Sequence, residues 1–256
     1  TANLNIQGEN GQLQITGTSS QLATPLEIES SVNLPEQTFS VAGSINDIAL
    51  NGSGSFGEAL QVAIDAVSGD DVMTLNVTGT AAQPELTLQG SLPAESLSPI
   101  IRVPLAGTVT ADVSRSNNGY AGTVSLEGEV SSVPVNATLT GNGADLQLSG
   151  SATAYGQDLQ LSGSVGPDIA VIAQGEIGAV TLSRNETGFV VMGEGTTPVL
   201  NASGFEVPSQ PWSLSGPVND LSLSIGGSEI AIEQNNGLEI SGDISQTIQR
   251  GGAEIL

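Results

Sequence analysis

Apolar and polar residues alternate along most of the chain. Between Ala137 and Gly163 the sequence contains A-T-L-T-G, L-Q-L-S-G and again L-Q-L-S-G, so one five-residue unit closes on a glycine three times. Successive side chains of a pleated strand point to opposite faces, and strict alternation is therefore typical of a strand with one apolar and one polar face. The pattern predicts a β-meander in which each closing glycine permits a tight reversal into the next strand.

The same unit recurs from one end of the chain to the other. It occurs eleven times, ending at Gly8, Gly17, Gly79, Gly90, Gly128, Gly141, Gly150, Gly163, Gly204, Gly216 and Gly242. Spacings of 9, 11 and 13 residues between successive units fit single strands joined by short hairpin turns. We therefore expect an all-β, antiparallel meander. It must bury its apolar face either by curling on itself or by stacking, as in a β-sandwich or β-solenoid.

A few segments depart from the alternation. Residues 93–104 and 205–217 each contain three prolines, and we expect a loop, a short helical turn or an internal break there within one elongated domain over residues 1–256. Trp212 lies in the second segment and is expected to plug an end of the core. Residues 58–67 have helix-favouring composition, but their apolar residues alternate and predict a strand.

Composition narrows the possible chemistry. The 256 residues include no Cys and no His, which excludes thiolate and imidazole metal sites, disulfides and Ser-His nucleophiles. Four Arg, no Lys and 27 acidic residues give a net charge of -23, which excludes nucleic-acid binding through phosphate contacts. Such a charge keeps a strand-rich chain soluble and discourages edge-to-edge association. Binding of Ca²⁺ is the alternative use of these carboxylates.

Acidic residues two positions apart are candidates for chemistry. Glu27 and Glu29, and likewise Glu127 and Glu129, are predicted to project side by side from one strand face. Paired carboxylates serve glycosidases or hold Ca²⁺, whereas alternation with apolar residues favours a solvated outer face. Asp70 and Asp71 follow Ser-Gly and form a candidate Ca²⁺ loop, with an ordinary acidic turn as the alternative. We expect no other cofactor.

Several stretches resemble the TamB and AsmA-like family of large envelope proteins of diderm bacteria. The resemblance rests on G-S-I-N-D-I-A-L from Gly43, G-P-V-N-D-L-S-L from Gly216, P-E-L-T-L-Q-G-S-L from Pro84, and D-L-Q-L-S-G-S at Asp145 and Asp158. It implies an elongated sheet curled lengthwise into a taco-like trough with an apolar interior. It also implies a periplasmic role in moving phospholipid or assisting outer-membrane assembly. The family's N-terminal membrane anchor and C-terminal docking segment are not recognisable, as expected for a piece of a longer parent chain.

The function expected from these observations is non-enzymatic. An apolar trough would shelter or conduct phospholipid acyl chains in the cell envelope, with neighbouring segments of the parent chain and an outer-membrane assembly protein as further partners. The alternative is a structural β-scaffold or surface adhesin with a closed, dry core. The predicted groove residues are Leu86, Leu88, Leu146, Leu148, Leu159, Leu161, Leu221, Leu223, Ile225, Leu238 and Ile240.

Overall fold

The computed structural model of the chain describes residues 2–19, 26–154, 156–166, 168–185, 188–202, 205–234, 238–242, 248–250 and 253–255. The chain divides into two compact units, Thr1–Ala152 and Thr153–Leu256. The described part of the chain contains no helix that is both long and apolar enough to span a bilayer.

Unit 1 consists of strands and one short helix. In chain order these are β1 (Ala2–Glu9), β2 (Gln12–Ser19), β3 (Leu26–Asn33), β4 (Thr38–Ile45), β5 (Ile48–Ser55), β6 (Leu60–Ser68), β7 (Asp71–Thr80), β8 (Gln83–Pro93), α1 (Ala94–Ile101), β9 (Leu105–Ser116), β10 (Gly119–Val130), β11 (Val133–Gly143) and β12 (Asp145–Ala154), which ends just beyond the unit boundary.

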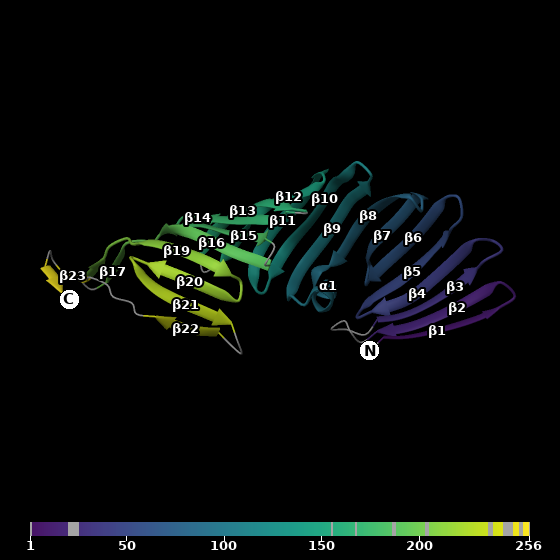
Figure 1. Ribbon diagram of the computed structural model, residues 1–256, viewed down its shortest axis with the longest axis horizontal. Coiled ribbons are helices and arrows are strands. Elements are labelled where there is room, and N and C mark those ends of the chain that lie inside the picture. Colours follow the sequence, from purple (N-terminus) through teal and green to yellow (C-terminus); the bar gives the residue numbers. More distant parts are fainter. Residues whose placement is uncertain are drawn as a thin grey trace. The chain divides into compact units, whose positions relative to one another are not determined.

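Each strand of unit 1 pairs antiparallel with the next strand in the chain, from β1 with β2 to β11 with β12 (Figure 1). The predicted all-β antiparallel meander is therefore confirmed, and the pairing is not that of a β-solenoid. The segment with helix-favouring composition forms β6, as its alternation predicts.

The registers place the apolar positions of neighbouring strands opposite one another. Leu139 of β11 faces Leu148 of β12, and Leu75 of β7 faces Leu88 of β8. Because faces alternate along each strand, these matches continue in steps of two and give the sheet one apolar and one polar face. The residue pattern of the repeated unit thus specifies the register as well as the strands.

The prediction that the chain reverses at the closing glycine of each unit is wrong. Gly90 lies inside β8 and Gly150 lies inside β12, so the repeated unit ends in mid-strand and the turns come later. These glycines share the apolar face, and a Cβ added at Gly90 would overlap the carbonyl oxygen of Val72 on the neighbouring strand. A glycine on that face lets adjacent backbones approach and the sheet bend, which is how inward glycines curve a sheet.

Residues 93–104 contain helix α1, one of the alternatives predicted there, with Pro93 and Pro104 on either side of the helix and Pro99 inside it. The helix packs on the apolar face of unit 1 through Leu97 and Ile100. The buried cluster beneath it consists of Ile45, Ile48, Met73, Leu92 and Ala111. Because these residues come from strands β4 to β9, the sheet of unit 1 curls around the helix.

Unit 2 contains β13 (Gln157–Val165), β14 (Ala170–Gly175), β15 (Gly178–Asn185), β16 (Gly188–Thr196), β17 (Leu200–Ala202), β18 (Phe205–Val207), β19 (Pro211–Pro217), β20 (Asp220–Ile225), β21 (Ser228–Gln234), β22 (Leu238–Gly242), β23 (Ile248–Arg250) and β24 (Ala253–Ile255). The meander runs through β13 to β16 and, after a short insertion, through β19 to β22. Strands β17, β18, β23 and β24 form a separate small sheet.

Trp212 fills a gap that glycines leave in unit 2. The residue belongs to β19, and a Cβ added at Gly195 or Gly178 would lie 2.7 or 2.8 Å from its indole ring. The indole Nε1 donates a hydrogen bond of 2.9 Å to the carbonyl oxygen of Ile177. The Trp212 indole ring therefore packs against backbone at these glycines, and an aromatic ring packed over glycines in a strand stabilises the sheet.

Candidate functional site

The predicted groove residues of unit 1 lie on its apolar face. Leu86 and Leu88 are neighbours on β8, and Leu146 and Leu148 are neighbours on β12. All four side chains are half-buried. The structure therefore brings each pair together on the predicted face, with several strands between the two pairs.

In unit 2, Leu159 and Leu161 lie on β13, and Leu221, Leu223 and Ile225 lie on β20. These five side chains are also half-buried. The apolar residues of β20 face those of its neighbours, as in the pairing of Leu223 with Leu214 and with Ile230. Leu238 and Ile240 belong to β22, but their side chains lie outside the described residues.

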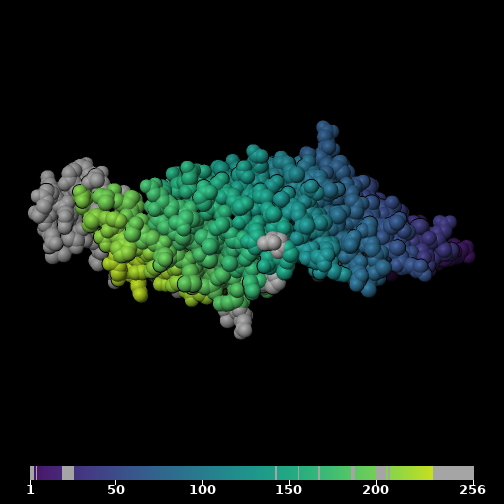
Figure 2. All heavy atoms as spheres, turned by 90° about the horizontal axis from the view of Figure 1, so that it is seen from above, coloured from purple at the N-terminus to yellow at the C-terminus, as the bar shows by residue number. Residues whose placement is uncertain are grey.

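These side chains are only half-buried, whereas the side chains of a dry core would be fully buried. The hydrophobic residues that are fully buried in the described part of the chain are Ile45, Ile48, Met73, Leu92, Ala94, Ala111, Ala152 and Ile230. None of the described groove residues is among them. Figure 2 shows one face of the molecule, on which the atoms of unit 1 form a continuous surface. The apolar face keeps area that an apolar ligand can cover.

A polar cluster that sequence reasoning missed fastens helix α1 to unit 1. The Ser96 hydroxyl donates to Asp47 Oδ2 at 2.8 Å, the Ser68 hydroxyl donates to the same oxygen at 3.3 Å, and the two hydroxyls lie 3.0 Å apart. Ser96 is 1% exposed. The hydrogen bond from Ser96 is the main cause that holds the pKa of the Asp47 carboxyl below its ordinary value.

Further hydrogen bonds hold the helix to β9. The backbone N–H of Leu105 donates to the Ser98 hydroxyl at 2.8 Å, and the backbone N–H of Gly107 donates to Glu95 Oε1 at 3.1 Å. The Asn-Asp pair before β5 is a turn signal in the sequence, and it places Asp47 in a turn where Asn46 has φ 56°. Nothing in the sequence pointed to Ser96 as the partner of Asp47.

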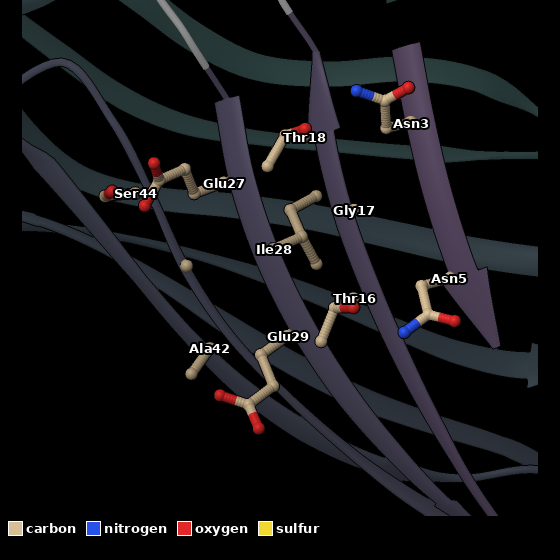
Figure 3. A pocket seen from close by; sticks show the side chains of 11 residues that line it. Asn3, Asn5, Thr16, Gly17, Thr18, Glu27, Ile28, Glu29, Ala42 and Ser44 are labelled. Atoms are coloured by element: carbon tan, nitrogen blue, oxygen red, sulfur yellow. The ribbon is translucent and has the colours of Figure 1, made fainter. Parts of the chain in front are cut away.

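The acidic pairs lie on the polar face. Figure 3 shows Glu27 and Glu29 side by side along β3, next to the Thr16 and Thr18 side chains of β2. They line a hollow of about 550 Å³, and both carboxylates are exposed. Glu127 and Glu129 on β10 are likewise exposed. The side-by-side projection predicted for Glu27 and Glu29 is present, and their exposure agrees with a solvated outer face.

The candidate Ca²⁺ loop lies at the turn between β6 and β7. Asp70 is exposed, and Asp71 Oδ1 accepts a hydrogen bond of 2.8 Å from the Ser91 hydroxyl. Among the described residues, no group of three or more His, Cys, Asp or Glu side chains is arranged to hold a metal ion. Calcium binding at Asp70 and Asp71 stays a prediction.

Comparison of the chain with protein-family models, curated proteins and solved structures finds no match.

Proposed function

We propose that the apolar face of this chain binds the acyl chains of phospholipid, sheltering or conducting them during lipid transport or membrane assembly in the envelope of a diderm bacterium. The observation that supports this proposal is the half-burial of the nine described groove residues, from Leu86 to Ile225. An acyl chain laid along this face would gain about 0.8 kcal/mol for each methylene that it removes from water.

The proposed activity needs no catalytic group. On the apolar face of each unit most alternate positions carry aliphatic side chains or glycine, and the aliphatic side chains make non-directional contacts with any acyl chain. The acidic residues Glu27, Glu29, Glu127 and Glu129 are exposed on the polar face, so they do not oppose apolar contacts on the other side of the sheet. The proposal also includes a location in the cell envelope and, as partners, neighbouring segments of a longer parent chain and an outer-membrane assembly protein.

A second function is favoured by one local observation. Around helix α1 the apolar face is covered, and Ile48 and Leu92 beneath it are each 2% exposed. A face covered in this way along its length would be the closed core of a structural scaffold or adhesin, which binds no lipid.

The experiment that separates the two functions places a charge on the apolar face away from α1. We expect a Leu148→Arg variant to fold and to lose lipid, because an arginine on an open face reaches water while repelling acyl chains. In a closed core the same substitution would unfold the protein, since an unpaired buried charge is strongly destabilising. The measurements are native mass spectrometry of the purified chain with extraction of co-purifying lipid, and thermal unfolding.

Ser149→Arg is the matched control, because Ser149 is exposed and adjacent to Leu148 but projects from the polar face. The control variant should retain both lipid and stability. Wild-type protein that carries no lipid and takes up no fluorescent phospholipid would rule out the lipid function and leave the scaffold.

A further inference from the structure

Two hairpins of this chain, one in each unit, carry the same motif. Ser114-Arg115 is followed after three residues by Gly119-Tyr120, and Ser183-Arg184 is followed after three residues by Gly188-Phe189. The motif spans the turn between β9 and β10 in unit 1 and the turn between β15 and β16 in unit 2. The chain has four arginines and no lysine, so the motif uses half of its cationic side chains.

In both hairpins the arginine stands opposite the aromatic residue. Arg115 pairs with Tyr120, and its guanidinium carbon lies 5.5 Å from the centre of the Tyr120 ring. Arg184 pairs with Phe189 in the corresponding register. A guanidinium beside an aromatic ring is held in place while its N–H groups stay available to an acceptor.

Both arginines project from the apolar face of their sheet. Arg115 comes two residues after Val113 and stands opposite Leu86, one of the groove residues. Arg184 comes two residues after Leu182, which faces Val191. Alternation along the strand gives residues two apart the same face, so each cation lies at the end of a row of aliphatic side chains. Both arginine side chains are exposed.

The carboxylates are arranged in the opposite way. In unit 1, Glu85, Asp112 and Glu127 stand at positions of the polar face, and in unit 2 Asp158 and Glu194 do the same. In the described strands of the meanders, Asp71 is the acidic residue in register with the apolar face. It begins β7, at the end of the strand where the β6–β7 turn lies, and it accepts a hydrogen bond from Ser91. Among the described residues, the ends of the apolar rows at Arg115 and Arg184 therefore combine positive charge with adjoining aliphatic surface.

We infer that these two hairpins are binding sites for the phosphate of an amphiphile whose acyl chains lie on the adjoining apolar face. The guanidinium presents paired N–H donors that match phosphate oxygens, and in unit 1 the Tyr120 ring orients that of Arg115. The inference rests on the proposed function, and it adds a requirement for an anionic phosphate ester in the ligand. An arginine opposite an aromatic residue at the end of an apolar row in both hairpins, in a chain with four arginines, no lysine and a net charge of -23, is the observation that favours this ligand over an uncharged lipid.

The test measures the dissociation constants of the delipidated chain for three probes, which are a fluorescent phosphatidylglycerol, a diacylglycerol with the same labelled acyl chain, and inorganic phosphate. In an Arg115→Gln, Arg184→Gln double variant we expect about a tenfold loss of affinity for phosphatidylglycerol, as for a charge-assisted contact, and unchanged affinity for diacylglycerol. Each single variant should remove one of two sites, which native mass spectrometry counts as bound lipid.

Arg102→Gln is the control for replacing an arginine outside the motif, because Arg102 is exposed and follows helix α1. This variant should bind phosphatidylglycerol as the wild type does. An Arg115→Lys variant keeps the charge without the planar fork and should bind with intermediate affinity.

The remaining outcomes decide against the inference in distinguishable ways. Equal binding of phosphatidylglycerol by the double variant and the wild type would leave the apolar groove in place without a phosphate site. Equal loss of both lipids would make the arginines structural. Inorganic phosphate bound as tightly as phosphatidylglycerol would indicate an ion site unrelated to lipid. Failure of the wild type to bind either lipid would reject the groove and its phosphate sites together.

Discussion

Glycines on the apolar face let neighbouring backbones come close in the sheet of unit 1. Gly90 has φ 124°, and the carbonyl oxygen of Val72 occupies the space that a Cβ would need. At Gly54 a Cβ would lie 2.5 Å from the carbonyl oxygen of Gln61 and 2.8 Å from the Phe39 ring, so both backbone and an aromatic side chain come close to that glycine. The apolar face is therefore a surface of aliphatic side chains interrupted by notches at which either backbone or an aromatic ring comes close.

We predict that Gly90→Ala lowers the free energy of unfolding by more than about 2 kcal/mol, because the new methyl group meets backbone and the φ value is unfavourable for alanine. Gly69→Ala is the control, since Gly69 has φ 61° but no atom within 4 Å of the added Cβ. This control should lose about 1 kcal/mol from its backbone conformation alone. Urea denaturation monitored by circular dichroism measures both, and equal losses would contradict the role given to close backbone approach.

At the scale of elements, helix α1 is the exception in a chain of strands. It contains Pro99, it ends at Arg102 in the left-handed conformation, and its first turn carries no side-chain cap. A helix this short has little stability of its own, so its packing and the Asp47 cluster hold it on the sheet.

We predict that Asp47→Asn destabilises unit 1 near neutral pH and that the difference from wild type shrinks in acid. The pKa of Asp47 is lower in the folded protein than in the unfolded chain, so its contribution is complete above the ordinary carboxyl pKa of about 4. That contribution is lost as the pH falls through the lowered pKa. Denaturation curves at several pH values test this, with Asp70→Asn in an exposed turn as the control. A difference independent of pH would contradict the role of the charge.

The elements also show how far the sequence predicts this fold. Alternation is a local property, and it correctly identified the strands, including β6, and the shared face of Leu86, Leu88, Leu146 and Leu148. The position of the turns was misjudged, because the position of a glycine within a unit does not reveal whether the backbone turns there or continues. The contact between Asp47 and Ser96 spans 49 residues and exists only because the sheet curls, so no local pattern could indicate it.

For the molecule as a whole, net charge and the edge of strand β1 bear on how one molecule meets another. Strand β1 pairs with β2 alone among the described strands, and Ile6 on β1 is 57% exposed. An unpaired strand edge of this kind can pair with another chain, and repulsion between molecules of net charge -23 opposes such contact.

We predict that the protein associates near pH 4, where its carboxylates take up protons and the repulsion weakens. An Ile6→Lys substitution should suppress association by adding a charge to the β1 edge. Met192→Lys is the matched control, because Met192 is 61% exposed on β16, away from β1 in the pairing. Analytical ultracentrifugation across the pH range measures the effect, and equal suppression by both variants would show that the β1 edge is not the route.

The hairpin-by-hairpin pairing of unit 1 has a consequence for how the chain acquires its structure. Each strand there finds its partner immediately before or after it in the sequence, which gives a low contact order and favours rapid folding. A growing or translocating chain can add one hairpin at a time to a sheet that has already formed. The bond between Asp47 and Ser96 can close only after α1 has emerged, so the curl that it fixes follows the emergence of β1 to β8.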